Sequence, residues 1–211
     1  MIPVRAISEP LAELLSARRA MVEEGRTLLN NPPWEEASRR ILIVRLSAWQ
    51  DIAISTSHLV LFSEVRNALP QAFVDFAFFP NRHDRTLIQR ASQEGGGTLP
   101  WYFGISSLQG PAAFDLVMVS NAFGLELVNL SALFVTSNIP TRASLRRASL
   151  PWPIFIIGGS NAAALGPIVV EKPDQEDSFV DGIFFGEGEG SVGPLASTLT
   201  DKSLSLDERL F

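Results

Sequence analysis

Short hydrophobic runs alternate along the chain with segments in which apolar residues recur at helical spacing. The runs cover residues 41–44, 73–78, 116–119, 154–157 and 183–185, and they are rich in β-branched and aromatic side chains. Continuous apolar runs of this length are typical of strands that are buried on both faces of a parallel sheet. The alternation therefore predicts an α/β fold with a doubly wound, mainly parallel five-stranded sheet of the flavodoxin or Rossmann type.

The segments between and after these runs are predicted to be helical. A helix follows the first run over residues 57–69, and a short one covers residues 84–91. Residues 125–135 are apolar almost all round, which predicts a well-buried helix. Residues 192–199 carry an apolar face at helical spacing and predict the last helix of the domain.

Three parts are expected along the chain. Residues 1–38 are expected to form an N-terminal helical extension. A helical pattern ends near Gly25, and an Asn-Asn-Pro-Pro break then precedes the first strand. Residues 39–200 form the α/β domain. The polar residues 201–211 are expected to be a tail that leads out of it.

Composition narrows the classes of partner. The 211 residues are 46% hydrophobic and carry a net charge of −6, which argues against a nucleic-acid-binding surface. No apolar run approaches the roughly 20 residues of a membrane span. The chain has no cysteine, which excludes disulfides and thiolate metal sites. Together with the lack of a signal-peptide pattern, this fits a cytoplasmic protein without membrane or nucleic-acid partners.

Ligands of open α/β sheets bind outside the carboxyl ends of the strands. That rule selects a set of candidate binding residues at one edge of the predicted sheet: Trp49, Ser120, Asn121, Gly158, Gly159, Ser160, Asn161, Gly186, Glu187, Gly188 and Glu189. These residues are expected to line one cleft that takes a small-molecule ligand, with Trp49 near its mouth.

Each of these motifs also has a structural interpretation. The pair Gly158–Gly159 either holds a phosphate or nucleotide tail or makes the tight turn that any strand-to-helix connection needs. Glu187 and Glu189 either bind a ribose hydroxyl, a cation or the backbone of a neighbouring domain, or they stabilise the start of the next helix through its dipole. Trp49 either stacks on a flat ligand or belongs to the core.

No catalytic residue or metal site is predicted. His58 lies in a predicted helix and is expected to be packed, and His83 is expected in a solvated loop, although Asp84 beside it would also suit a base or ligand. Two histidines without cysteine give no recognisable metal spacing. Arg142, Arg146 and Arg147 form a small basic cluster that is expected to be a solvated face or a docking patch.

A longer pattern runs from about residue 40 to residue 199. Its members, in order, are Phe114–Asp115, Ser120, Asn129, Ile139–Pro140, Arg142 or Arg146, Gly158–Gly159, Asp181 and Gly186-Glu187-Gly188-Glu189. This pattern resembles the N-terminal cobalamin-binding-like domain of a subclass of radical S-adenosylmethionine proteins. The resemblance implies a strand order of 2-1-3-4-5 and makes cobalamin the candidate cofactor.

The resemblance also implies that the chain is part of a longer protein. In the family, a C-terminal barrel with a C-x3-C-x2-C motif carries the iron–sulfur cluster and S-adenosylmethionine, and this barrel would be the main partner of the domain. Without cysteine, this chain alone is not expected to be an enzyme or to cleave S-adenosylmethionine reductively.

The chain departs from the family pattern where cobalt would be ligated. The D-x-H-x-x-G signature is absent, and the sequence after the first strand reads Ser47-Ala-Trp-Gln-Asp51. The usual Asn-Pro-Glu-Pro between the last two strands is replaced at residues 164–168. Cobalamin would therefore bind without a histidine ligand, and a valine at Gly159 is expected to obstruct its tail.

Three hypotheses on function follow. In the first, the chain is the non-catalytic N-terminal domain of a radical S-adenosylmethionine enzyme and binds or shields a cofactor or substrate. In the second, it is a stand-alone α/β module that binds a nucleotide-like ligand. In the third, it is a purely structural domain whose rim docks on its neighbour.

Overall fold

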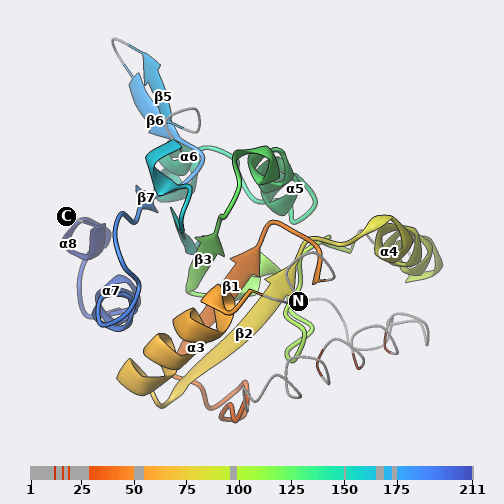
Figure 1. Cartoon of the computed structure of the whole chain (residues 1–211), viewed down its shortest axis with the longest axis horizontal. Coiled ribbons are helices and arrows are strands. Elements are labelled where there is room, and N and C mark those ends of the chain that lie inside the picture. Colours follow the sequence, from red (N-terminus) through yellow and green to blue (C-terminus); the bar gives the residue numbers. More distant parts are fainter. Residues whose placement is uncertain are drawn as a thin grey trace.

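A five-stranded, all-parallel sheet forms the centre of the protein in the computed structural model (Figure 1). The structure describes residues 12, 16, 19, 29–49, 55–95, 99–149, 151–164, 169–172 and 175–210. The predicted N-terminal helix lies almost entirely outside these residues. The strand order β2-β1-β3-β4-β7 confirms the predicted order 2-1-3-4-5.

The strands occupy the predicted hydrophobic runs. They are β1 (Arg39–Arg45), β2 (Ala72–Phe78), β3 (Leu116–Ser120), β4 (Ile154–Gly158) and β7 (Gly182–Ile183). The apolar residues of the first four strands are buried, as expected for strands covered on both faces. The fifth strand is shorter than predicted, because the chain leaves the sheet after Ile183.

Helices cover both faces of the sheet, which confirms a doubly wound α/β fold. On one face, α3 (Ser57–Ala68) and α7 (Val192–Leu199) pack through Phe62 and Ala196 against one core cluster. On the other face, α5 (Leu130–Val135) contributes to a second cluster (Figure 1). The remaining longer helix, α4 (Arg82–Gly95), follows β2 and forms a small apolar cluster of its own through Ile88 and Ala91.

The segment predicted as one buried helix over residues 125–135 is different in the structure. A 3₁₀ helix, η3 (Gly124–Asn129), precedes the short α5. The expected all-round burial is wrong, because Leu125 is 88% and Val128 71% exposed. The short α5 buries Leu133 on the sheet, and nothing among the described residues covers the opposite side of η3.

A hairpin that the sequence pattern does not predict connects β4 to β7. Its strands are β5 (Val169–Lys172) and β6 (Gln175–Ser178), paired antiparallel, and it projects away from the main sheet (Figure 1). At its base, Ser144 donates hydrogen bonds to Asp177 through its hydroxyl, at 2.8 Å, and through its backbone N–H, at 3.2 Å.

The C-terminal residues fold back onto the domain. Helix α8 (Leu206–Leu210) lies beside α7, and both its leucines pack against the core cluster of that face. Lys202 forms an ion pair of 2.9 Å with Asp115. The boundary at residue 200 stays a prediction, but these contacts attach the predicted tail to the domain.

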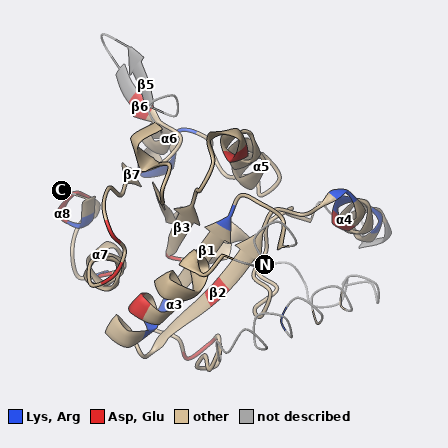
Figure 2. Ribbon diagram, in the orientation of Figure 1, with Lys and Arg blue, Asp and Glu red and all other residues tan. Residues whose placement is uncertain are grey.

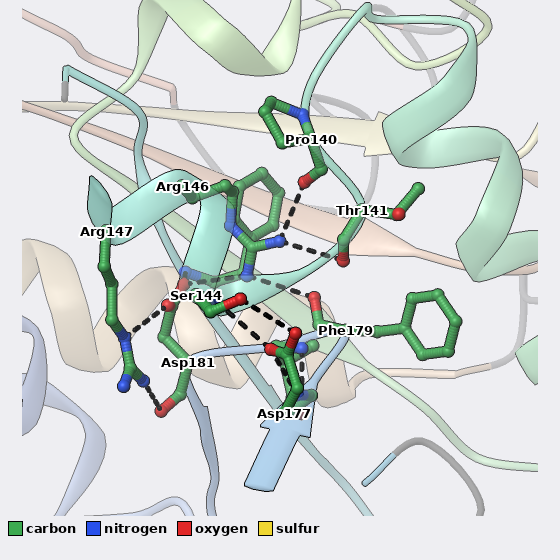
Figure 3. Close-up of polar contacts among 11 residues, drawn as sticks. Pro140, Thr141, Ser144, Arg146, Arg147, Asp177, Phe179 and Asp181 are labelled. Carbon is green, nitrogen blue, oxygen red and sulfur yellow. Dashed lines mark hydrogen bonds and ion pairs between the residues drawn. The ribbon is translucent and has the colours of Figure 1, made fainter. Parts of the chain in front are cut away.

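A buried arginine joins α6 (Ala143–Ala148) to the sheet. Arg146 is 2% exposed, and its guanidinium lies 5.0 Å from the ring centroid of Phe134 and 4.8 Å from that of Phe155. Its Nη2 donates to Oδ2 of Asp181 at 3.1 Å (Figure 3). The two rings and the carboxylate thus enclose the charge on three sides.

The same guanidinium also holds three backbone carbonyls. Nη1 donates to the carbonyl oxygens of Pro140 and Thr141, and Nη2 donates to that of Phe179. These carbonyls belong to the loop before α6 and to the turn before β7, which are far apart in sequence (Figure 3). Arg146 therefore fixes the relative position of two chain segments.

The prediction of a solvated basic cluster is wrong for Arg146. Asp181 directly precedes β7, and its carboxylate compensates the charge of the buried guanidinium. The same carboxylate oxygen accepts a hydrogen bond from the backbone N–H of Phe155 at 2.9 Å. Arg147 is more exposed and pairs with the second oxygen of Asp181 at 3.3 Å. Arg142 approaches Asp177 at 3.9 Å and is the most exposed of the three.

Candidate functional site

A cleft of about 600 Å³ opens at the carboxyl ends of the central strands. One wall is the start of α3, and the opposite side consists of the loops that follow β4 and β7. Most of the predicted site residues line it: Ser120, Gly158, Gly159, Ser160, Gly186, Glu187, Gly188 and Glu189. Four separate chain segments therefore meet at the edge of the sheet where α/β domains bind their ligands.

Sheet register explains why these segments meet. Arg45, Ser120 and Gly158 are neighbours across the last row of β1, β3 and β4. Residues that follow these positions must therefore emerge side by side. The loop after β7 reaches the same edge, and its Gly190 N–H donates to Oε2 of Glu64 on α3 at 2.8 Å.

Asn121 and Asn161 do not line the cleft. Asn121 is fully buried, and its Nδ2 donates to the carbonyl of Phe123 and to Oε2 of Glu126, both at 2.9 Å. Asn161 donates through Nδ2 to Oδ1 of Asn121 at 2.8 Å. Both predicted site residues thus tie the loop after β3 to the loop after β4, and they support the rim from behind.

Trp49 is in the core, and the predicted location at the mouth of the cleft is wrong. Its side chain is 8% exposed and meets Phe78 and His58 edge to face, with ring centroids 5.1 and 5.8 Å apart. The aromatic strand β2 and helix α3 form an apolar pocket there, and burial of an indole in such a pocket is strongly favourable. The interpretation of Trp49 as a core residue is the one that holds.

The two glycines after β4 have different constraints. Gly159 has a φ of +118°, and a Cβ placed on it would lie 2.3 Å from the backbone oxygen of Asn121. At Gly158 a Cβ would lie 3.1 Å from the carbonyl oxygen of Phe184. The tight-turn interpretation thus accounts for Gly159, and a substitution there tests folding before it tests binding.

The glycine-rich loop after β7 borders the cleft with fewer constraints. Gly186 has a φ of +117°, and no atom lies within 4 Å of the position of a Cβ. Glu187 and Glu189 are exposed, and Figure 2 shows this acidic segment between β7 and α7. Their carboxylates therefore face solvent and the cleft, and they are available to accept hydrogen bonds from a ligand.

A buried cation that is not among the predicted site residues lies beside the cleft. Arg45, the last residue of β1, is 2% exposed, and its Nη1 donates to the hydroxyls of Ser57 and Ser120. Both hydroxyls line the cleft. Burial lowers the pKa of Arg45, and the negative charge of Glu126 opposes this effect. The signal in the sequence is a charged residue directly at the end of a run buried on both faces.

Glu126 is the anchor of the loop after β3. Its Oε1 accepts a hydrogen bond from the hydroxyl of Ser47, and its Oε2 accepts from Asn121 Nδ2 and from the backbone N–H of Ala122 at 3.0 Å and Phe123 at 3.3 Å. Each carboxylate oxygen is thus occupied by donors from the protein. Glu126 therefore shapes the rim and has little capacity left for a ligand.

The two histidines lie outside the cleft lining. His58 is buried in α3, as predicted, and neither of its ring nitrogens has a hydrogen-bond partner among the described residues. Burial, followed by repulsion from Arg45, lowers the pKa of His58 to about 4. His83 is exposed in the first turn of α4 rather than in a loop.

Acid is expected to destabilise the fold through His58. The unfolded chain binds a proton on this ring near pH 6.5, whereas the folded protein does so only near pH 4. The stability that the neutral ring supports is therefore complete above pH 6.5 and is lost as the pH falls to 4, by up to about 3 kcal/mol. Urea unfolding between pH 7 and pH 4.5 measures this slope.

The matched variants are His58→Phe and His83→Gln. Phenylalanine suits the aromatic surroundings of His58, which include Trp49, Phe76 and Phe78. We expect the phenylalanine variant to lose most of the slope in this pH range and the His83 variant to keep it. Equal slopes in all three proteins would contradict this assignment.

The described residues contain no group of three or more histidine, cysteine, aspartate or glutamate side chains placed to hold a metal ion. Within the same residues, no helix has the length and apolar character needed to cross a membrane. Comparison of the chain with protein-family models, with curated proteins and with solved structures finds no match in any of the three.

Proposed function

We propose that this chain is a non-catalytic ligand-binding domain that serves a radical S-adenosylmethionine barrel and takes the tail of cobalamin into its cleft. One observation carries the proposal. The end of β3 and the loops after β4 and β7 converge on a cleft whose lining includes four glycines and five hydroxyl-bearing residues beside apolar side chains. Such a cleft admits a ligand close to the backbone, at the edge of the sheet where α/β domains bind their ligands.

The residues of the cleft fit a cofactor tail without cobalt ligation. No histidine lines the cleft: His58 is buried among aromatic rings, and His83 is on α4. The lining combines apolar side chains such as Val60 and Ile156 with hydroxyls such as Ser57 and Ser120. A benzimidazole ring would contact the former, and the ribose and phosphate of the tail would bond to the latter.

Exposed apolar side chains near the rim support the proposal that a partner domain docks there. Phe123, Leu125 and Val128 lie on or next to η3, which follows β3, and Phe185 follows β7. They are 64–88% exposed. Large apolar residues in such positions often belong to interaction surfaces. The proposed partner is the radical S-adenosylmethionine barrel, which would supply the iron–sulfur cluster and the reaction.

Reading the gene beyond Phe211 tests this partner directly. A continuation that carries C-x3-C-x2-C in a barrel-forming sequence supports the accessory role. An open reading frame without such a motif would instead favour a stand-alone module that binds a nucleotide-like ligand at the same cleft.

Titration with hydroxocobalamin tests the cofactor. We expect saturable binding below about 100 μM, because a ligand enclosed in such a cleft reaches micromolar affinity with about −8 kcal/mol of binding free energy. The measurement is a titration of the purified domain, followed by the absorption spectrum of hydroxocobalamin. The expected spectrum contains no sign of histidine ligation to cobalt.

Two tryptophan variants give a matched control. Ser160→Trp places a large side chain at the cleft, where the serine is exposed and makes a single long hydrogen bond of 3.4 Å to Ala122. Ser63→Trp places the same side chain on an exposed position of α3 that does not line the cleft. Binding should be lost in the first variant and kept in the second. If the unmodified domain does not bind at about 100 μM, the cofactor role fails and the rim is better interpreted as a docking surface.

A further inference from the structure

We propose that the cleft holds the phosphate group of a sugar phosphate ester at the amino terminus of α3, in front of Arg45. This inference rests on the proposed ligand-binding function and adds the chemical class and the orientation of the ligand. It depends on three features of the described residues: an uncapped helix terminus, a buried cation without an ion-pair partner, and acidic residues on a loop that meets α3 beyond its first turn.

The first feature is the start of α3. The N-cap residue, Thr56, makes no side-chain capping hydrogen bond, and the first turn contains no acidic residue. The terminus opens into the cleft, since Ser55, Thr56 and Ser57 all line it. The amino end of a helix carries partial positive charge and free N–H groups, and it attracts phosphate when nothing else occupies it.

The second feature is the charge of Arg45. The guanidinium is buried, its Nε has no hydrogen-bond partner, and no described carboxylate forms an ion pair with it. The negative charge of Glu126 acts on Arg45, but the oxygens of Glu126 are taken by Ser47, Asn121 and backbone N–H groups. A buried cation is costly unless an anion accompanies it.

Arg45 lies directly behind the lining of the cleft. Its Nη1 donates to the hydroxyls of Ser57 and Ser120, on the first turn of α3 and the end of β3, and both hydroxyl-bearing residues line the cleft. Figure 2 shows the basic end of β1 beside the start of α3. A phosphate at the helix terminus would accept hydrogen bonds from backbone N–H groups and lie against hydroxyls that the guanidinium polarises.

The third feature sets the orientation of the ligand. The acidic loop, residues 186–190, meets α3 beyond its first turn: a Cβ on Gly188 would lie 3.7 Å from Leu61, and Gly190 donates its N–H to Glu64. Leu61 and Glu64 are four and seven residues beyond Ser57, or about 6 and 10 Å along the helix at 1.5 Å per residue. Glu187 and Glu189 repel phosphate but accept hydrogen bonds from hydroxyls. The phosphate therefore lies at the α3 end, and the sugar hydroxyls point toward the acidic loop.

The test uses ribose 5-phosphate, with ribose and inorganic phosphate as comparison ligands. Calorimetric titration of the domain at low ionic strength, up to about 10 mM ligand, should show binding of ribose 5-phosphate that is at least about tenfold tighter than that of either comparison ligand. Equal affinity for inorganic phosphate would mean that the site recognises a free anion and would overturn the sugar-phosphate assignment.

Two charge variants locate the site without disturbing the fold. Thr56→Glu puts a carboxylate at the exposed α3 terminus, where it stabilises the helix but repels phosphate. Ser63→Glu makes the same charge change at an exposed position of the same helix, outside the cleft. We expect binding to weaken about tenfold or more in the first variant and less than about twofold in the second. Equal effects, or no binding to the unmodified domain, would overturn the proposal.

Arg45→Met tests the buried cation separately, with circular dichroism to verify folding. Binding of ribose 5-phosphate should be lost if the folded variant keeps its structure, and full affinity would contradict the role of Arg45. The outcome also separates this inference from the cofactor proposal. Hydroxocobalamin binding without ribose 5-phosphate binding would refute the phosphate site alone, and the reverse result would refute the cobalamin role alone.

Discussion

Replacement of Arg146 by methionine is expected to lower the free energy of unfolding by about 3–5 kcal/mol. The variant leaves the buried carboxylate of Asp181 without its closest cation and leaves the carbonyls of Pro140, Thr141 and Phe179 without a donor. Methionine fills much of the space between the two phenylalanine rings, so the loss reports on charge and hydrogen bonding rather than on a cavity. Urea unfolding at pH 7 measures the change.

Arg147→Met is the matched control for this variant. Arg147 is on the same helix and pairs with the same carboxylate, but its side chain is 36% exposed. A partly exposed pair of this kind contributes only about 0–1 kcal/mol. If both variants lose the same small amount of stability, the cluster does not hold α6 to the sheet as we infer.

A Gly159→Ala substitution is expected to cost about 3 kcal/mol of unfolding free energy. The backbone at Gly159 has a φ of +118°, and the new methyl group would lie 2.3 Å from the backbone oxygen of Asn121. Positive φ costs a residue other than glycine about 1–2 kcal/mol, and a forced shift in a packed region costs about 1–3 kcal/mol more. Thermal and urea unfolding of the purified variant measure the loss.

Gly188→Ala is the control, because it is also in a glycine motif at the rim. A Cβ at Gly188 would lie 3.5 Å from Val192 and 3.7 Å from Leu61, which is ordinary contact. We expect a change of less than about 1 kcal/mol there. A stable Gly159 variant would show that the turn after β4 has room for a side chain, contrary to the structure.

The sheet was predictable because its strands are buried on both faces. Continuous apolar runs such as residues 41–44 and 154–157 have few other stable placements, and the order of the strands follows the prediction. A hydrophobic pattern predicts burial less well where only one side of a segment is covered. Residues 125–135 are apolar throughout, but Leu125 and Val128 are exposed. The hairpin of β5 and β6 gave no signal, because its strands are short and largely polar.

The position of the candidate site was predictable, but the buried positive charge beside it was not. The position follows from the direction and order of the strands alone. The role of Arg45 was not predictable, because its partners, Ser57 and Ser120, are 12 and 75 residues away in the sequence. Only the register of β1 against β3 places Arg45 beside Ser120. The burial of Arg146 was missed for the same reason, since Asp181 is 35 residues distant.

Amide NMR spectra of the domain during the hydroxocobalamin titration show whether the cleft at the carboxyl edge of the sheet is the ligand site. We expect the shifted amides to be confined to the cleft: Ser57, Ser120, Gly159, Ser160, Gly186 and Gly188 should move together and saturate together. Amides of α4, such as that of Ile88, should stay in place and serve as an internal reference. Shifts that concentrate on α4 or on the exposed face of η3 while the cleft residues remain unchanged would mean that the cleft is not the ligand site.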